Sequence, residues 1–361
     1  MTVARAYGFR LVAPGRPLER HDFAPPQPGP DEVIVEVAGC GVCHTDLGFA
    51  VEGVPTRQAP PLILGHEISG RVVDAGDRAS AWLGRSVIVP AVIPCGDCPA
   101  CAAGRPAICR RQFMPGNDGD GGFATHVKVP SRGLCPVPDS LPAGLSLADL
   151  SVVADAVTTP YEAIRLSGLG ADDVAVFVGA GGVGGFGVQI AAAKGAAVAA
   201  IDVDAGRLEL ASAHGASIVL DASKIDAKEI KSSVRAFVKQ SGRKGIGLKV
   251  FETSGTPAGQ ATAFGLVDFG GWLGVVGYTT KNVEVRLSNL MALDATARGN
   301  WGCPPNRYPE ALSLVLEGRV RIGPYVRHYA LDDTVAVLEA VRTHTIRHRP
   351  VLVPGDPGAR N

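Results

Sequence analysis

One stretch near the middle of the chain constrains the fold most, because it joins a strand-like apolar run to a glycine-rich turn. Residues Val174–Val178 are apolar throughout and predict a buried β-strand. The turn after them has the spacing G-x-G-x-x-G and consists of Gly179, Ala180, Gly181, Gly182, Val183 and Gly184. Residues 183–194 then predict a helix. Because a helix N-terminus free of side chains lets a pyrophosphate approach unpaired backbone N–H groups, the stretch predicts a dinucleotide site.

An acidic residue after the next strand supports this interpretation. Residues 197–201 predict a second apolar strand, which ends in Asp202. An acid about 20 residues past the first glycine is placed to bind the adenosine ribose hydroxyls. Because a carboxylate there repels a 2′-phosphate, we expect NAD rather than NADP.

A membrane-spanning helix is the alternative for the uncharged run between Val174 and Ala193, whose length would allow it. The run contains six glycines and Gln189, and charged residues border it on both sides. A buried strand, turn and helix are therefore expected instead.

Overall length and charge exclude several classes of protein. A chain of 361 residues suggests about two domains. Its 35 basic and 35 acidic residues balance, so the overall charge indicates neither nucleic-acid nor anionic-membrane binding. Arginines interrupt the apolar residues of the first twenty positions, so no signal peptide is expected and the cytoplasm is the expected location.

Three segments follow one another along the chain. Residues 1–155 are rich in predicted strands and loops, and residues 156–294 alternate strands and helices, which implies a parallel sheet. Residues 295–361 are expected to return and complete the first domain. The individual predictions are strands at 32–37, 68–73, 86–92, 123–129, 218–220, 249–253, 271–276 and 349–353, and helices at 205–214, 227–240, 308–317 and 332–343.

Four of the eight cysteines lie within fifteen residues, as Cys95, Cys98, Cys101 and Cys109. Without a secretion signal, cysteines favour metal or redox roles over disulfides. Four thiolates at this spacing predict a closed structural zinc site in a lobe of about residues 93–112. An iron–sulfur cluster, whose bacterial spacing continues differently, and a C-x-x-C redox pair are the alternatives.

A second group of metal-binding residue types lies in the β-rich segment. Cys43 as a thiolate and His66 as a neutral imidazole are good zinc ligands, and a catalytic zinc needs a third ligand and one open position. A buried cysteine is more often a packing residue, however, and a lone histidine more often a hydrogen-bonding one. The residue types alone leave the question open.

Taken together, these motifs resemble the zinc-dependent medium-chain alcohol dehydrogenases. The resemblance covers almost the whole chain and rests, in chain order, on Gly41-Val-Cys-His-Thr-Asp46, Gly65-His-Glu67, the four clustered cysteines, Gly121-Gly-Phe-Ala124 and the glycine-rich turn. It implies an α/β protein with a Rossmann doubly wound parallel-sheet domain and a β-rich, GroES-like catalytic domain that carries the structural-zinc lobe. It also implies NAD and two zinc ions per chain, one catalytic and one structural.

The resemblance further implies the residues of the catalytic zinc site. Cys43 and His66 would bind the metal together with Asp155, which stands where many relatives have cysteine and which would otherwise be a helix-capping acid. Glu67 would lie behind the metal or transiently on it, and Asp46 would hold the other ring nitrogen of His66.

Roles in hydride and proton transfer are implied in the same way. Zinc would stabilise the substrate as an alkoxide, hydride would pass to the nicotinamide, and Thr45 would take the alcohol proton. His44 would face the cofactor pyrophosphate, Thr159 would pack near the nicotinamide, and Arg207 would hold the adenosine ribose unless it is a solvated helix charge. Many relatives carry a relay histidine where this chain has Gly48, so its proton exit must differ.

At a finer level, residues 48–50, 93–95 and 114–117 resemble dehydrogenases that oxidise a cyclic secondary alcohol, carried as a CoA thioester, in anaerobic aromatic degradation. Basic residues available for the CoA phosphates, each of which is otherwise a solvated surface charge, are Arg57, Arg319, Arg327 and Arg347.

Other functions remain compatible with the sequence. They are a general secondary-alcohol or cyclic-ketone reductase without CoA, a zinc hydratase or lyase without net redox, and a non-catalytic nucleotide sensor. The family resemblance suggests a homodimer or homotetramer built through the cofactor domains, and no nucleic-acid or membrane partner is expected.

Overall fold

The computed structural model describes residues 6–355, which divide into two compact units. Unit 1 contains the described residues up to Thr158, residues 302–313 and those from Tyr325 onward. Unit 2 contains residues 159–301 and 314–324.

From the sequence, residues 295–361 are expected to return as one segment to the first domain. The structure instead divides the described residues of this segment between the two units. Residues Thr296–Gly299 form a strand that pairs in parallel with Trp272–Val275 in unit 2. Residues 314–324 also belong to unit 2, where the buried side-chain amide of Gln189 bonds both the N–H and the C=O of Arg321. Backbone pairing and this buried amide therefore hold both stretches in unit 2.

Unit 2 is built on a six-stranded parallel sheet; the sequence predicts a parallel sheet and five of its six strands. Its strands are β9 (Val174–Val178), β10 (Ala197–Asp202), β11 (Ile218–Asp221), β12 (Lys249–Glu252), β13 (Trp272–Val275) and β14 (Thr296–Gly299). Across the sheet the strands are ordered β11-β10-β9-β12-β13-β14, with β9, the first strand of the unit, near the centre. From β9 the chain first adds β10 and β11 on one side and then adds β12, β13 and β14 on the other, so the strand order reverses at β9. This is the doubly wound order, in which ligands bind beyond the carboxyl ends of the strands at the reversal.

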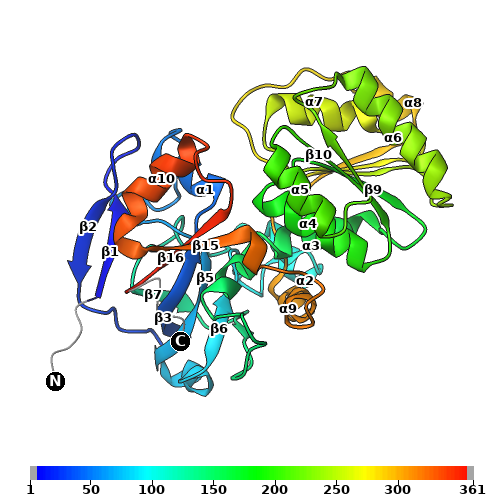
Figure 1. Ribbon diagram of the computed structural model, residues 1–361. Helices are drawn as coiled ribbons and strands as arrows, with labels where there is room; N and C mark the ends of the chain where they lie inside the picture. Colours follow the sequence, from blue (N-terminus) through cyan, green and yellow to red (C-terminus); the bar gives the residue numbers. More distant parts are fainter. Residues whose placement is uncertain (1–5, 356–361) are drawn as a thin grey trace. The chain divides into compact units, whose positions relative to one another are not determined.

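Helices cover both faces of this sheet (Figure 1). The helices of this part of the chain are α3 (Thr158–Ser167), α4 (Gly182–Ala193), α5 (Ala205–Ala213), α6 (Ala227–Ser241), α7 (Pro257–Leu266) and α8 (Ser288–Ala292), of which α8 buries no residue. Side chains cap three of them: Asp204 accepts from the Arg207 N–H, and Asp226 and Thr256 act likewise at α6 and α7. Because β9 is covered on both faces, all five of its residues are buried, which explains its continuous apolar sequence.

Unit 1 consists mainly of antiparallel sheets. A seven-stranded sheet contains β3 (Glu32–Gly41), β5 (Glu67–Ala75), β6 (Ser86–Val89), β7 (His126–Pro130), β8 (Cys135–Pro136), β15 (Val326–Ala330) and β16 (Arg349–Val353). A three-stranded sheet contains β1 (Ala6–Leu11), β2 (Glu19–Phe23) and β4 (Leu62–Ile63). Strand β3 is central, because it pairs with β5, β7 and the C-terminal β16.

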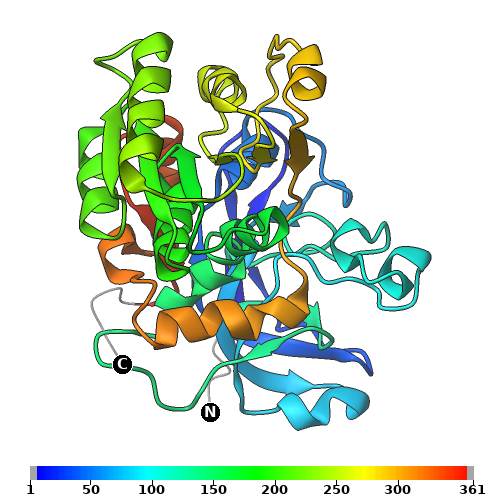
Figure 2. The same cartoon turned by 90° about the vertical axis from the view of Figure 1, so that its right-hand side faces the viewer.

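The remaining helices are short. They are α1 (His44–Ala50), α2 (Pro99–Ala102), α9 (Tyr308–Leu316), α10 (Thr334–Arg342) and the 3-10 helices η1 (Asp77–Trp82), η2 (Pro106–Ile108), η3 (Asp149–Ala154), η4 (Pro305–Arg307), η5 (Gly323–Tyr325) and η6 (Leu331–Asp333). The cysteine-rich lobe carries α2 and η2 and has no other regular structure (Figure 2, cyan). Within residues 6–355, no helix is long and apolar enough to cross a membrane.

Several elements differ from the sequence-based predictions. The sequence patterns did not predict strands β1, β2, β4, β8, β14 and β15 or helices α1, α2, α7 and α8. Helix α7 is rich in alanine and glycine and lacks a clear 3.6-residue apolar period, although Thr256 before Pro257 is a usable start signal. The strand predicted at 86–92 ends at Val89, because Pro90 cannot donate a ladder hydrogen bond.

The core of unit 2 contains an aromatic pair, and truncating one member tests how tightly that core is packed. Phe177 and Phe251, both fully buried, stack with ring centroids 4.8 Å apart. We expect Phe251→Ala to lower the free energy of unfolding of unit 2 by about 3–5 kcal/mol, through lost burial and the cavity left behind. The measurement is hydrogen exchange of the β9 and β12 amides.

The matched control is Phe269→Ala, whose side chain is 74% exposed and which should change stability by less than about 0.5 kcal/mol. Equal effects of the two substitutions would contradict the assigned core.

Candidate active site and metal centres

Four metal-binding side chains converge in unit 1. One donor atom each from Cys43, His66, Glu67 and Asp155 lies within 4.8 Å of the others. Asp155 Oδ2 is 3.8 Å from Cys43 Sγ and 3.8 Å from His66 Nε2. Ligands of one tetrahedral zinc, at bond lengths of about 2.0–2.3 Å, lie roughly 3.3–3.8 Å apart. The Cys43, His66 and Asp155 donors therefore match a zinc site in chemistry and spacing.

The buried carboxylate of Asp46 orders two of these ligands. Asp46 Oδ2 accepts the Cys43 backbone N–H at 2.8 Å, at the start of α1. Asp46 Oδ1 lies 3.2 Å from His66 Nδ1 and accepts the hydrogen bond of its N–H, and Nε2 faces Asp155. One acid thus caps the helix that follows Cys43 and fixes the His66 tautomer.

The protonation of His66 depends on what occupies the cluster. Burial by itself lowers the pKa of the imidazole, but the carboxylates of Asp46 and Asp155 outweigh it and raise this pKa well above the ordinary value. A cation at Nε2 would take the place of that second proton. The arrangement therefore favours a positive charge between His66 and Asp155.

Glu67 is fully buried and is held by an arginine from the far end of the chain. Arg349 Nε donates to Glu67 Oε2 at 3.1 Å, and Arg349 Nη2 donates to Oε1. Burial raises the pKa of Glu67 to about 7, although Arg349 opposes this rise. A Cβ on Gly41 would lie 2.0 Å from Glu67 Oε2, so glycine is needed there. Because both oxygens bond Arg349, Glu67 is better placed behind a metal than on it.

Asp155 follows helix η3, which residues from the C-terminal part of the chain hold at both ends. At the start of η3, His328 Nε2 lies 2.9 Å from Asp149 Oδ1. At its end, the Tyr308 hydroxyl donates to the Ala154 C=O and accepts the Ala91 N–H at 3.1 Å. The sequence-based prediction included none of these contacts, because no local motif marks a side chain that acts on a segment about 150 residues away.

The cluster opens toward solvent on the side of Asp155 and Thr45. The Asp155 side chain is 19% exposed, whereas that of His66 is 3% exposed. Thr45 is half-buried, and its Oγ1 lies 3.7 Å from Cys43 Sγ. His44 is exposed, with Nε2 3.5 Å from Glu52 Oε1, and Gly48 lies buried within α1.

The second cluster consists of the thiols of Cys95, Cys98, Cys101 and Cys109. Neighbouring sulfurs lie 3.4–3.6 Å apart, far beyond the ~2.05 Å of a disulfide and close to the about 3.8 Å between thiolates on one zinc. A hydrogen bond from the Cys101 backbone lowers the pKa of Cys98 to about 6, whereas the pKa values of Cys95 and Cys101 are raised, so Cys98 is the thiol of these three that ionises most readily. All four positions are taken by protein, so the site suits a structural metal.

The glycine-rich turn in unit 2 has the backbone that a dinucleotide needs. Gly179 has φ +99°, and a Cβ on Gly184 would lie 1.8 Å from the Gly179 oxygen. Gly181 is the N-cap of α4, which begins with Gly182 and Val183. Only glycine fits at Gly179 and Gly184, so the first turn of α4 presents bare N–H groups.

Asp202 and Arg207 lie beside this turn. The buried Asp202 accepts the backbone N–H of Ala180 at 2.7 Å, and Arg207 Nη1 is 4.0 Å from its Oδ2. The Arg207 side chain lies over Gly181, and its buried Nε has no hydrogen-bond partner among the described residues. A ribose hydroxyl would satisfy this donor, so the residues fit the cofactor. Thr159, whose C=O accepts from Asn300 Nδ2 at 3.1 Å, is also buried in unit 2.

Known families match both units. The model described as "Alcohol dehydrogenase GroES-like domain" matches residues 29–139, and that described as "Zinc-binding dehydrogenase" matches residues 182–317. An alcohol dehydrogenase of Geobacillus stearothermophilus is 30% identical over 93% of this chain and 95% of its own length. An L-threonine 3-dehydrogenase of Bacillus licheniformis is 28% identical over 88% of this chain and 90% of its own.

A solved structure agrees with these relatives. The alcohol dehydrogenase of Aeropyrum pernix superposes with a TM-score of 0.85 at 29% identity, over 96% of this chain and all of that one.

Removal of one thiol should have different consequences in the two cysteine-containing clusters. We expect Cys43→Ala to remove one zinc per chain and abolish turnover, with the melting temperature nearly unchanged. Cys98→Ala should remove the other zinc and mainly lower stability, because that metal orders a lobe with little regular structure. The measurements are zinc per chain by elemental analysis, turnover and thermal unfolding. Equal losses of stability in both variants would contradict the division into two sites.

The Tyr308 hydroxyl predicts a remote effect on the first cluster. Tyr308→Phe leaves the Ala154 C=O and the Ala91 N–H without this partner, and we expect zinc to leave the Cys43 cluster about tenfold faster. The measurement is zinc release to a chelator, in which the four-cysteine site is an internal reference. Tyr329→Phe, also in unit 1, is the control, and release accelerated equally from both sites would count against a positioning role for Tyr308.

Proposed function

The chain belongs to the zinc-dependent medium-chain alcohol dehydrogenases, and from this premise we propose that Cys43, His66 and Asp155 hold the zinc at which a secondary alcohol is oxidised to a ketone. As a member of this family, the protein is an oxidoreductase that uses zinc and a nicotinamide dinucleotide. The supporting observation is a set of three converging donors with one side open to solvent. A fourth protein ligand would close the position that a substrate oxygen needs.

The proposed division of labour follows from the contacts of each side chain. When bound, zinc supplies a Lewis acid for the substrate oxygen and the nicotinamide accepts the hydride. The Thr45 hydroxyl lies beside the Cys43 sulfur on the open side, where it receives the alcohol proton. Asp46 holds His66 in one tautomer, and the Glu67–Arg349 pair fills the space behind the cluster.

The cofactor that we propose is NAD rather than NADP. The Asp202 carboxylate lies beside the turn and repels a 2′-phosphate, and the unpaired Arg207 Nε offers a donor to the ribose. His44 is exposed at the first turn of α1 and is proposed to face the pyrophosphate, with Thr159 near the nicotinamide. Proton exit then proceeds through ribose hydroxyls and water, since Gly48 offers no relay side chain.

As the substrate we propose a cyclic secondary alcohol, specifically the thioester 6-hydroxycyclohex-1-ene-1-carbonyl-CoA. The motifs at residues 48–50, 93–95 and 114–117 support this choice by their resemblance to the corresponding dehydrogenase.

The arginines considered for CoA binding have other partners. Arg57 pairs with Asp118 at 3.1 Å, Arg319 donates to the Ala193 C=O, and Arg327 lies 5.8 Å over the Tyr329 ring. These contacts favour, as the second candidate, a dehydrogenase for simple cyclic alcohols without CoA.

A homo-oligomer through unit 2 is proposed as well. Strand β14 is an edge of the parallel sheet, all four of its residues are exposed, and Leu287 and Met291 nearby are 69% and 78% exposed. An exposed edge beside apolar side chains is a surface that a second copy would cover.

The substrate assignment is tested by NADH formation from the thioester and from free cyclohexanol. We expect kcat/KM for the thioester to be about 100-fold higher, because binding of the CoA part contributes to the transition state. Thr45→Val should lower kcat by about 100-fold or more with zinc retained. NADP in place of NAD is the cofactor control. A higher kcat/KM for cyclohexanol than for the thioester would contradict the CoA substrate and support the second candidate. An unchanged kcat in Thr45→Val would contradict the proposal that Thr45 receives the alcohol proton.

A further inference from the structure

Helix α6 of unit 2 presents a row of basic side chains that the dehydrogenase reaction does not use. Lys228, Lys231, Arg235 and Lys239 follow one another at spacings of three, four and four residues, so they share one face of the helix. The side chain of Lys231 is half-buried and the other three are exposed. This basic row borders the face that packs Val234 against the sheet.

The charge of this row is not neutralised within the chain. Residues 224–249 contain eight lysines and arginines and two acidic residues, although the whole chain has 35 of each sign. Among residues 6–355, no carboxylate lies within 4.0 Å of the charged groups of the basic row. A concentrated positive region on a neutral protein attracts anionic partners.

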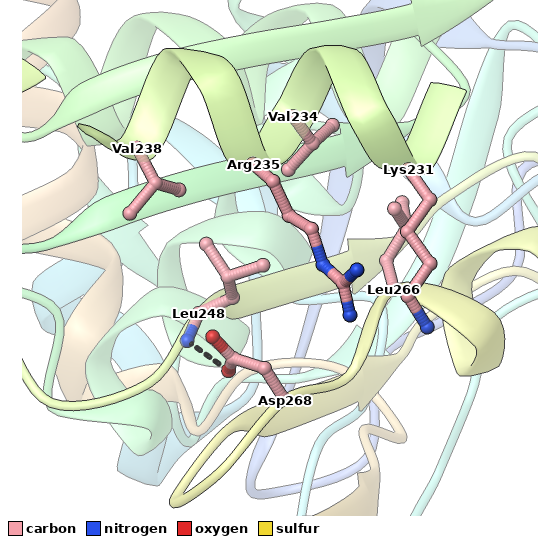
Figure 3. Close-up of a pocket in the computed structure, with 7 residues that line it drawn as sticks. All are labelled: Lys231, Val234, Arg235, Val238, Leu248, Leu266 and Asp268. Carbon is pink, nitrogen blue, oxygen red and sulfur yellow. Dashed lines mark hydrogen bonds between the residues drawn. The ribbon is translucent and has the colours of Figure 1, made fainter. Parts of the chain in front are cut away.

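A cavity opens in the middle of the basic row. It has a volume of about 100 Å³ and is lined by Lys231, Val234, Arg235, Val238, Leu248, Leu266 and Asp268. Figure 3 shows the Lys231 and Arg235 side chains reaching from α6 to this cavity, with Lys231 beside Leu266 and Arg235 between Leu266 and Asp268. Asp268 is fixed by the Leu248 N–H, which it accepts at 2.7 Å, and Lys231 donates to the Gly265 C=O at 2.6 Å.

The lining of the cavity indicates what would fill it. Val234, Leu248 and Leu266 are at most 5% exposed and form an apolar floor. A dry apolar cavity of ~150 Å³ binds benzene, so about 100 Å³ suits a smaller aliphatic group such as a leucine or valine side chain. Hot spots of protein interfaces lie in small, desolvated pockets and are enriched in arginine, and this cavity joins an apolar floor to Arg235.

This surface is separate from the nucleotide site. Leu248 precedes β12, so the cavity lies at the amino ends of the parallel strands, whereas the glycine-rich turn follows the carboxyl end of β9. Cofactor phosphates bind at the carboxyl ends. The basic row is therefore not explained by NAD.

We propose that the basic face of α6 docks an acidic segment of a partner protein. The segment places one aliphatic side chain in the cavity over Leu248 and Leu266. Its carboxylates pair with Arg235 and with the neighbouring lysines Lys228, Lys231 and Lys239. Docking here leaves the residues assigned to catalysis untouched.

The test uses the full chain, saturated with NAD, and a fluorescent peptide with the sequence Glu-Glu-Leu-Glu-Glu. Fluorescence anisotropy should give saturable binding at about 20 mM salt that weakens at least about tenfold at roughly 200 mM salt. A peptide with alanine in place of leucine should bind about tenfold more weakly, because it cannot fill the cavity.

Variants identify the surface. Arg235→Glu should weaken binding of the leucine peptide about tenfold or more, and Val238→Phe, which fills the cavity, should abolish the preference for leucine over alanine. Lys194→Glu, an exposed charge reversal at the end of α4, is the matched control and should bind like the wild type. NADH production should be equal in all of these proteins, which separates this proposal from the proposed function.

Three outcomes would overturn the proposal. They are no saturable binding of the leucine peptide, equal binding of the leucine and alanine peptides, and equal weakening by Arg235→Glu and Lys194→Glu. Isovalerate that displaces the peptide at stoichiometric concentration would also overturn it, in favour of a small-carboxylate site.

Discussion

Burial of two carboxylates, Asp46 and Glu67, is the constraint on which unit 1 depends. Each is at most 1% exposed, and an ionised carboxylate without partners in such surroundings would cost several kcal/mol. Asp46 is compensated locally, by the Cys43 N–H and the His66 ring. Glu67 is compensated mainly by Arg349, which lies 282 residues further along the chain. The sheet that brings β16 beside β3 is therefore also what makes a buried glutamate tolerable.

The same constraint links the architecture to the chemistry. Because Arg349 occupies both oxygens of Glu67, the donors left to share a cation are Cys43, His66 and Asp155. Asp155 in turn depends on η3, whose two ends are bonded by His328 and Tyr308. The proposed metal site, with three protein ligands and one open side, therefore depends on contacts that Tyr308, His328 and Arg349 make with η3 and Glu67.

The two metal clusters differ for a physical reason visible in their surroundings. The four cysteines lie in one short segment that contains its own turns. Their thiols occupy all four ligand positions of a tetrahedral metal, so we expect that site to affect the stability of the lobe. The Cys43 cluster takes its ligands from three separate segments and keeps one side open. Metal affinity there depends on the packing of the whole unit, and this coupling allows a remote hydroxyl such as that of Tyr308 to influence it.

Features encoded by local spacing can be predicted from the amino-acid sequence. The parallel sheet of unit 2, its glycine-rich turn and the four-cysteine lobe each follow from residues a few positions apart, because backbone conformation and thiolate ligation act at that range. The family resemblance then indicated Cys43, His66 and Asp155 as one group. Three other features become visible only in the folded chain: Arg349 neutralises Glu67, Tyr308 and His328 hold η3, and residues 314–324 belong to unit 2. Folding also brings Lys231 and Arg235 of α6 to the wall of one cavity. These features join side chains distant in sequence, and their energies depend on burial and on partners that exist only in the folded chain.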